Sequence, residues 1–288
     1  MDLTDAAAYH GGAYEHRDAP EGGDYCGTLE TAFLCTLAET PADDPDAYQF
    51  LEAPDAEAFN EEVLAYRDRL EAHGVETVVR ESPHPNAVYS ADAFLGFDGD
   101  LYLSRMASEV RKPEEPEYFA FAHERGYDPV VPFRAGEYFE VSNAIPSNSG
   151  LVLGVGQRGT AAAAERFASV VDAETTTVRI SDDVQHLMGA LRPLPDGRAA
   201  IRPDKIADEV LERLEQCYDG FLEFDETEEV VRKQAMNFTI ATDETIFMPD
   251  DTPNAESKLA DSYSVETTSV EAIRAGAGGL ACLTGRVD

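Results

Sequence analysis

Hydrophobic and polar positions recur along the chain at a spacing of roughly 50 residues, which is typical of repeated structural units. In the clearest unit, residues 87–97 predict a strand, Asp98-Gly99 a tight turn and residues 101–103 a returning strand. Asp-Gly is a preferred dipeptide in two-residue hairpins. A helix is then expected over 114–124 and a further strand over 129–131, from the change in apolar period. The unit is therefore strand, strand, helix, strand.

The same order recurs in residues 139–180, 187–224 and 237–265. In each stretch a turn-forming segment separates two short apolar segments, and a helical pattern and another apolar segment follow. The expected turns are Asn148-Ser149-Gly150, Asp196-Gly197 and Asp243-Glu244.

A fifth unit is expected to be divided between the two ends of the chain. Residues 280–283 would pair with residues 29–34, and a helix over 55–72, stopped by Gly74, would complete the unit. Pairing the first strand with the last closes a ring and removes sheet edges that otherwise invite aggregation. The alternative is an ordinary α/β sandwich in which the spacing is coincidental.

The chain length allows one large domain with a sizeable core, because 43% of the 288 residues are hydrophobic. We assign residues 28–288 to a single domain. Residues 1–27, which are rich in Gly, Tyr, Asp and His, are expected to form an irregular segment.

Acidic residues outnumber basic ones by 57 to 22, giving a net charge of −35. The acidic residues are spread along the whole chain, which indicates a solvated surface of one sign that stays soluble in concentrated salt. Without a basic patch, nucleic acid is excluded as a partner. The first residues show no basic-then-apolar signal pattern, and no apolar run approaches ~20 residues, so we expect a cytoplasmic protein without a membrane partner. Whether it forms a homo-oligomer stays open.

Polar residues occur where the first strand of several units should be apolar. They are Asp92, Glu140, Asn143, His186 and Cys282. Each alone has an ordinary explanation, such as a cap, a solvated carboxylate or a buried thiol. Recurrence at one point of a repeat instead predicts that these side chains converge on the axis of the ring, and convergent ionisable groups mark functional sites.

Cysteine, histidine and two carboxylates form a coherent chemical set. A thiolate is a nucleophile, histidine transfers protons, and ionised carboxylates accept the forked N–H groups of a guanidinium. Three glycines, Gly276, Gly278 and Gly279, come shortly before Cys282, and glycine allows turns and close approach of other groups. The four cysteines show no metal-ligand or disulfide spacing. An acidic site also argues against a peptide substrate.

The ordered motifs resemble those of the guanidino-modifying pentein superfamily, and among its members dimethylarginine dimethylaminohydrolase most of all. The resemblance covers roughly residue 28 to the end. Its motifs are Pro85-Asn86-Ala87-Val88-Tyr89-Ser90-Ala91-Asp92, Phe139-Glu140-Val141-Ser142-Asn143, Gln185-His186-Leu187 and Gly278-Gly279-Leu280-Ala281-Cys282. It implies an α/β fold, a five-bladed pentein propeller with pseudo-fivefold ββαβ-type repeats around a central active-site channel.

The resemblance also implies roles for individual residues. Cys282 would attack the guanidinium carbon, and His186 would protonate the departing amine and then activate water. Asp92 and Glu140 would hold the guanidinium. Asn86 lies in the motif that binds the substrate, and Arg111 and Arg158 are the expected ligands of a substrate carboxylate. No cofactor and no metal is implied; the partner is a small guanidino compound.

Three positions depart from the family pattern. Met188 stands where deiminases and amidinotransferases have an aspartate, which favours an N-substituted guanidine such as a methylated arginine. Val141-Ser142 replaces two glycines, and Ala281 replaces a histidine. The alternatives are an arginine deiminase, an amidinotransferase and a non-enzymatic binding module built on the same ring, although such a module would need a basic face.

Overall fold

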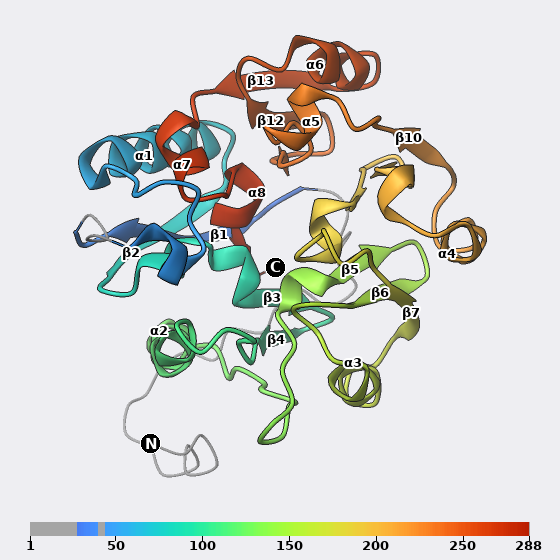
Figure 1. Cartoon of the computed structure of the whole chain (residues 1–288), viewed down its shortest axis with the longest axis horizontal. Coiled ribbons are helices and arrows are strands. Elements are labelled where there is room, and N and C mark those ends of the chain that lie inside the picture. Colours follow the sequence, from blue (N-terminus) through green and yellow to red (C-terminus); the bar gives the residue numbers. More distant parts are fainter. Residues whose placement is uncertain (1–27, 40–43, 288) are drawn as a thin grey trace.

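The computed structural model describes residues 28–39 and 44–287. The segment predicted to be irregular, residues 1–27, lies outside the described residues, as does Cys26. The described strands form one five-stranded sheet and three three-stranded sheets, all of them short and none of them closed into a barrel. The fold is therefore α/β and is built from small mixed sheets, which Figure 1 shows arranged around a centre.

The three small sheets share one pairing pattern: an antiparallel hairpin, followed by a third strand parallel to the second. The predicted turns at Asn148, Asp196 and Asp243 lie between the hairpin strands. The strands are β5 (Ala144–Ser147), β6 (Gly150–Val155), β7 (Glu174–Arg179), β8 (Leu191–Pro193), β9 (Ala199–Ile201), β10 (Phe221–Glu223), β11 (Thr239–Ile240), β12 (Thr245–Pro249) and β13 (Ser264–Thr268).

A helix connects the second strand to the third in each small sheet, as the sequence predicts. These helices are α3 (Ala161–Ala168), α4 (Asp208–Leu214) and α6 (Pro253–Ala260). Thr160 caps the first of them, because its hydroxyl accepts a hydrogen bond from the Ala163 N–H. Each of these helices packs into a different hydrophobic cluster, and the sheets lie between neighbouring clusters: Val152 of β6, for example, belongs to the cluster of α4, whereas Leu151 and Leu153 belong to that of α3.

The five-stranded sheet joins the two ends of the chain. Its strands, in spatial order, are β2 (Glu76–Ser82), β1 (Thr31–Leu37), β14 (Gly285–Arg286), β3 (Phe94–Phe97) and β4 (Asp100–Leu103). Arg286 pairs with Ala32 of β1 and with Leu95 of β3. The predicted pairing of the chain ends is thus observed, with α1 (Ala56–Ala72) connecting β1 to β2.

Two predicted strands are wrong in their position. Leu280–Leu283 is a helical turn, α8, and the strand that pairs with β1 begins at Gly285. A short apolar run cannot be assigned to a strand or a buried helical turn from its period alone. The Thr284 hydroxyl also donates to the Leu280 carbonyl and stabilises the turn. Of residues 129–131, Val130 forms only an isolated parallel bridge, with Tyr102.

The first strands of the units begin later than the sequence pattern predicts. The residues ahead of them form single 3₁₀ turns, namely Pro85–Val88, Ser90–Asp92, Val141–Asn143 and Leu187–Gly189. Short polar side chains compete with ladder hydrogen bonds in such places. For example, the Asn143 side-chain carbonyl accepts from the Leu187 N–H at 2.9 Å, which ties two neighbouring units together.

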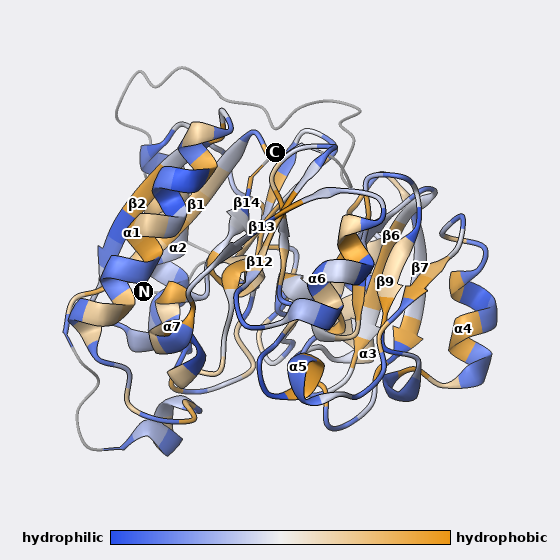
Figure 2. Cartoon of the chain, turned by 90° about the horizontal axis from the view of Figure 1, so that it is seen from above, coloured by the Kyte–Doolittle hydropathy of each residue, from blue (hydrophilic) through white to orange (hydrophobic). Residues whose placement is uncertain are grey.

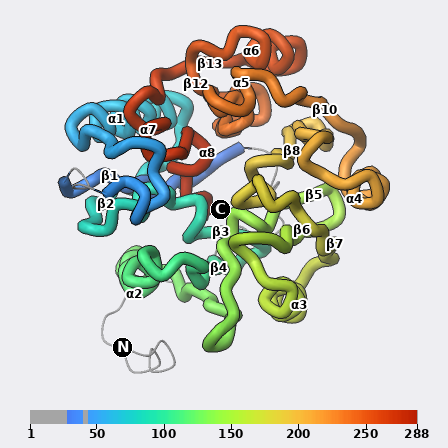
Figure 3. The backbone as a smooth tube through the Cα atoms, in the orientation of Figure 1, coloured from blue at the N-terminus to red at the C-terminus, as the bar shows by residue number. Residues whose placement is uncertain are grey.

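The helices α1, α3, α4 and α6 lie at the periphery, whereas the short α8 lies near the centre (Figures 1 and 3). Besides those already named, α2 spans Glu115–Glu124, α5 Glu228–Val231 and α7 Glu271–Ala275. Seen from above, the helices carry hydrophilic residues beside hydrophobic ones, whereas many strands are strongly hydrophobic (Figure 2). Within the described ranges, no helix has both the length and the apolar character needed to cross a membrane.

Candidate active site

The polar residues singled out from the sequence occupy equivalent places in successive units. Asp92 ends the 3₁₀ turn ahead of β3, Glu140 precedes the turn ahead of β5, and His186 precedes the turn ahead of β8. Asn237 lies just before β11, and Cys282 lies on α8, just before β14. The sequence pattern was therefore correct about the recurrence, although these residues sit in short turns rather than in the strands.

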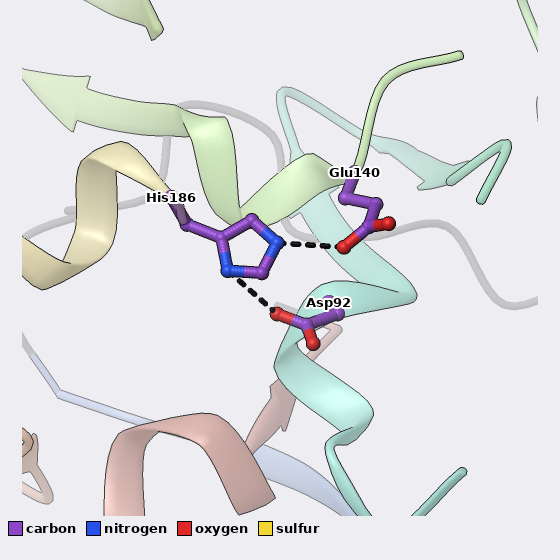
Figure 4. Close-up of side chains that lie close together, drawn as sticks. All are labelled: Asp92, Glu140 and His186. Atoms are coloured by element: carbon purple, nitrogen blue, oxygen red, sulfur yellow. Dashed lines mark hydrogen bonds and ion pairs between the residues drawn. The ribbon is translucent and has the colours of Figure 1, made fainter. Parts of the chain in front are cut away.

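Asp92, Glu140 and His186 lie close together, with the imidazole between the two carboxylates (Figure 4). The His186 Nε2 atom is 2.6 Å from Glu140 Oε2, and Nδ1 is 3.6 Å from Asp92 Oδ1. The side chains of Asp92 and Glu140 are 6% and 0% exposed, so both carboxylates are shielded from water. The imidazole is thus held between two acidic groups, which fix its orientation.

Glu140 is surrounded by hydrogen-bond donors and positive charge. Its Oε1 accepts from the Ala107 N–H at 3.0 Å and from Arg158 Nη1 at 3.4 Å, and Arg111 Nη1 lies 3.8 Å from Oε2. Burial alone would raise the pKa of Glu140, but the hydrogen bond and charge of His186, with the two arginines, hold it below its usual range. Glu140 is therefore ionised at neutral pH.

Arg111 places a guanidinium from the chain itself directly on Asp92. Its Nη1 donates to Asp92 Oδ2 at 2.6 Å, while its Nε donates to Glu114 at 3.1 Å. The other Asp92 oxygen accepts from the Ser142 hydroxyl at 2.8 Å. Burial lowers the pKa of Arg111, but Glu114, Tyr118 and Asp92 together raise it by more than burial lowers it. The pKa of Arg111 therefore lies well above its usual value. Both oxygens of Asp92 thus already have donors.

Arg158 and Asn86 line the same small cavity, whose volume is about 50 Å³. Arg158 donates to the side chain of Gln49, and Asn86 donates to the Tyr48 carbonyl at 2.8 Å. The buried Oδ1 of Asn86 has no partner among the described residues. All seven side chains predicted for the site belong to this cluster: Cys282, His186, Asp92, Asn86, Arg111 and Arg158 line the cavity, and Glu140 contacts His186.

Asn237 holds Cys282 by two hydrogen bonds. Its Nδ2 donates to the Cys282 sulfur at 3.0 Å, and its Oδ1 accepts from the Cys282 N–H at 3.1 Å. Burial first, and then the charge of Asp92, raises the pKa of the Cys282 thiol above its usual value, although Asn237 partly opposes them. Without a ligand, the thiol is therefore largely protonated at neutral pH.

Sequence reasoning did not assign a site role to Asn237. The available signal was its position immediately before the first strand of the fourth unit, which matches the positions of Asp92, Glu140 and His186 in the other units.

The glycines before Cys282 allow other groups to approach its backbone closely. A Cβ atom on Gly278 would lie 2.1 Å from Tyr89 Cε1, and one on Gly279 would lie 2.7 Å from Asn237 Cγ. The Tyr89 hydroxyl donates to the Gly276 carbonyl. The left-handed residue of this segment is Ala277, with φ of 69°, and not a glycine. The glycines of this segment are therefore needed because other side chains pack closely against them, and not because the backbone turns there.

A second and larger cavity, of about 270 Å³, lies beside the first. Gln185, His186, Ala277 and Cys282 line both. The larger one also has an apolar part, formed by Met188, Val230, Val231, Met236 and Ala281. A ligand whose reacting carbon lies at Cys282 could therefore extend into both spaces.

The same acidic cluster also has the composition of a metal site. The ligand atoms of Asp92, Glu140 and His186 lie within 4.8 Å of one another. Arg111 nevertheless places a positive charge 2.6 Å from Asp92 and 3.8 Å from Glu140. A metal cation would have to displace it, so the arrangement suits a guanidinium better than a metal ion.

No sequence-family profile matches this chain, and no curated protein does. Solved structures do match. The apo structure of ArgZ, an arginine dihydrolase from the ornithine-ammonia cycle in Cyanobacteria, aligns with a TM-score of 0.79 at 21% identity, over 89% of this chain and 40% of that one. The N-terminal domain of ArgZ bound to product aligns with a TM-score of 0.78 at 20% identity, over 91% and 98%.

A third match is dimethylarginine dimethylaminohydrolase (DDAH) from Pseudomonas aeruginosa, a cysteine-to-serine mutant complexed with citrulline. Its TM-score is 0.73 at 19% identity, over 90% of this chain and 99% of that one. The chain thus spans about 40% of full-length ArgZ but nearly all of the isolated ArgZ domain and of DDAH. At the level of the fold, the resemblance predicted from the motifs is confirmed: the chain has the α/β fold of guanidino-modifying penteins, DDAH among them.

Proposed function

We propose that the chain is a cysteine-dependent hydrolase that cleaves a C–N bond of a small guanidino compound, with N-methylated arginine as the favoured substrate. The observation that carries this proposal is that a cysteine, a histidine and a buried carboxylate line one cavity, and a second buried carboxylate is hydrogen-bonded to the histidine. A guanidinium, that of Arg111, already lies on Asp92 in this cavity. The reaction needs no cofactor.

In the first half of the reaction, the substrate guanidinium binds to the carboxylates beside Cys282. Its positive charge favours loss of the thiol proton to His186. The thiolate attacks the guanidinium carbon and forms a C–S bond. The C–N bond to the leaving group then breaks as His186 returns the proton to the departing nitrogen, which gives an amine and a covalent thiouronium intermediate.

In the second half, His186 takes a proton from water as the oxygen adds to the same carbon. The C–S bond breaks, the sulfur recovers a proton from the product, and the ureido compound leaves. His186 then releases its proton to solvent. Glu140, hydrogen-bonded to Nε2, orients the ring and stabilises its protonated form in both halves.

Substrate binding requires Arg111 to exchange partners. Both oxygens of Asp92 have donors in the described state, so an incoming guanidinium must replace Arg111 at Oδ2. A displaced Arg111 would be available for the carboxylate of an amino-acid substrate, together with Arg158. Asn86, whose buried Oδ1 has no partner among the described residues, is assigned to substrate binding in the same cavity.

Met188 and the apolar part of the larger cavity support an N-methylated substrate. An aspartate at position 188 would bind an unsubstituted nitrogen, whereas methionine there and the neighbouring Met236 and Val230 suit methyl groups. The second candidate is hydrolysis of arginine itself, with release of ammonia; amidino transfer and a non-enzymatic binding role follow. The matched structures are described as an arginine dihydrolase and a DDAH, so neither substrate is favoured by fold alone.

The finer description of the fold belongs to the same proposal. The recurrent pairing pattern supports a five-bladed propeller of ββαβ-type units, in which residues 28–288 form one domain and the site lies in the central channel. We also retain a cytoplasmic location, and a single-chain or homo-oligomeric assembly stays open.

The decisive experiment is product analysis at high KCl with arginine, mono- and dimethylarginine and agmatine, using Cys282→Ser as the control. Citrulline with an alkylamine is the expected result. Ammonia with citrulline or ornithine from arginine would transfer the assignment to the second candidate. A folded protein that converts none of these compounds, or a Cys282→Ser variant that retains activity, would contradict the proposal.

A further inference from the structure

A third cavity, of about 100 Å³, is lined by residues of the first strands of all the units. Leu95 of β3, Ile145 of β5, Arg192 of β8, Thr239 of β11 and Arg286 of β14 contribute to its wall. Ala281 and Met188 line both this cavity and the larger active-site cavity. The third cavity therefore lies directly behind the wall that carries Cys282.

The charge of this cavity is opposite to that of the protein. Its wall contains two arginines, Arg192 and Arg286, and hydroxyls of Ser142, Thr239 and Thr284, but no aspartate or glutamate among the described residues. The whole chain has a net charge of −35. A small cationic cavity without carboxylates is thus unusual in this molecule and requires a physical explanation.

Arg192 is the critical residue. Its Nη2 donates to the Phe238 carbonyl at 2.8 Å, and its guanidinium carbon lies 5.5 Å from the centre of the Phe238 ring. Its Nε is buried without a hydrogen-bond partner among the described residues, and the charged groups that act on Arg192 are Cys282, Tyr66 and Arg286, with no carboxylate among them. Burying a charge without a counter-charge is unfavourable, because the charge loses its hydration without gaining a partner.

The remaining polar groups of the wall could complete an anion site. The Thr239 hydroxyl makes a long contact, 3.5 Å, with the Thr284 hydroxyl and also interacts with the Tyr66 hydroxyl. Those two hydroxyls bond to each other as well, so the Thr239 proton can be donated to an anion. Apolar residues such as Phe94, Val141 and Ile240 form the rest of the wall. Guanidinium and hydroxyl donors in a small apolar cavity suit a compact monovalent anion better than a bulky or strongly hydrated one.

We propose that this cavity binds a small monovalent inorganic anion, such as chloride or bromide, against Arg192. The anion supplies the counter-charge that the described residues lack. The site differs from the guanidino site in that no carboxylate lines it, whereas Asp92 lines the small cavity beside Cys282, and these two cavities have no lining residue in common. The proposal therefore holds or fails independently of the hydrolase reaction.

One consequence links the two sites. Arg192 is among the groups that lower the pKa of the Cys282 thiol, although burial and Asp92 raise it more. An anion at Arg192 would cancel part of that effect. Chloride should therefore slow alkylation of Cys282 at a fixed pH relative to a larger anion at equal ionic strength.

The test compares KCl with potassium gluconate at equal high ionic strength, because gluconate is too large for the cavity. In the wild type, the thermal midpoint should rise by about 2 °C for each tenfold increase in chloride above its dissociation constant. Arg192→Met should abolish this chloride-specific rise. Arg198→Met, which removes a surface arginine paired with Asp196, should retain it. Equal midpoints in the two salts for the wild type would overturn the proposal.

A crystal of the wild type soaked in bromide provides a direct measurement that does not depend on a variant. An anomalous peak in the cavity beside the Arg192 Nε atom is the expected result. No peak there, or a peak accompanied by equal midpoints in chloride and gluconate, would mean that the cavity does not select a small anion.

Discussion

The side chain of Asn237 holds the nucleophile of the proposed reaction by one hydrogen bond that it donates and one that it accepts. Asn237 contacts both the sulfur and the backbone N–H of Cys282, so it sets the position of the thiol and partly offsets the effect of burial on its pKa. At this scale, the site consists of single side chains that short turns place close together, and each side chain can be tested by its own substitution.

Asn237→Ala should destabilise the thiolate form of Cys282 relative to the thiol. Loss of a hydrogen bond to an ionised group costs about 1.5–3 kcal/mol, so the pKa of Cys282 should rise and alkylation at fixed pH should fall by roughly 10- to 100-fold. The measurement is the pH dependence of iodoacetamide labelling, with the modified cysteine located by mass spectrometry. Asn148→Ala, at an exposed turn, is the control. Unchanged labelling in Asn237→Ala would remove Asn237 from the site.

Glu140→Gln should lose stability in a pH-dependent way. Because the folded pKa of Glu140 lies below its unfolded value of about 4.3, its ionised form stabilises the fold above that pH, and the stabilisation is lost as pH falls through the folded pKa. We expect a loss of about 3 kcal/mol at pH 7, because a partner of His186, Arg111 and Arg158 is removed.

Urea unfolding of Glu140→Gln and the wild type at pH 7, 5.5 and 4 in high salt measures this effect, with the exposed Glu109→Gln as the control. The difference between the two proteins should shrink toward the lowest pH. A difference that is constant with pH would show that Glu140 acts through packing and not through its charge.

At the scale of elements, much of the fold could be predicted, because long amphipathic helices and Gly-containing turns carry strong signals. The helix predicted over 114–124 is α2, and the one over 55–72 is α1, capped by Asp55. Leu280–Leu283 was assigned wrongly, because four apolar residues fit a buried strand and a buried helical turn equally well. The starts of the inner strands were also missed, since tertiary contacts such as that of Ser142 with Asp92 decide them.

The residues of the candidate site could be predicted from the sequence, but the contacts among their side chains could not. The recurrence of polar residues identified Asp92, Glu140, His186 and Cys282 as a group. The sequence could not show that Arg111 pairs with Asp92, because the path of the segment between β4 and α2 brings the two residues together. That contact depends on the orientation of side chains in three dimensions.

Gly278→Ala tests how the segment before α8 is placed. The new Cβ atom would lie 2.1 Å from Tyr89 Cε1, so Tyr89 or α8 must shift. Overpacking of this kind costs about 1–3 kcal/mol of unfolding free energy, and turnover should fall because Cys282 moves with α8. Gly189→Ala is the stability control, since its Cβ would meet nothing closer than 3.6 Å. Adding Tyr89→Leu to Gly278→Ala should restore part of the loss; full stability of Gly278→Ala alone would contradict the reasoning.

At the scale of the whole molecule, charge is the dominant feature. The net charge is −35, and several of the 22 basic residues, among them Arg111, Arg158 and Arg192, lie in the interior cluster and cavities and not on the surface. The surface is therefore more acidic than the composition alone suggests, and its self-repulsion opposes the compact state.

Salt should therefore stabilise the fold through screening. The Debye length falls from about 10 Å at 0.1 M to about 3 Å at 1 M salt, so repulsion between neighbouring surface carboxylates is largely removed over this range. The thermal midpoint should rise with KCl and, by the same mechanism, with potassium gluconate. The rise common to both salts measures surface repulsion, whereas any excess in chloride measures binding at Arg192. A thermal midpoint that stays constant in both salts would contradict the screening argument. If repulsion between surface carboxylates destabilises the fold, then salt, which screens that repulsion, must raise the midpoint.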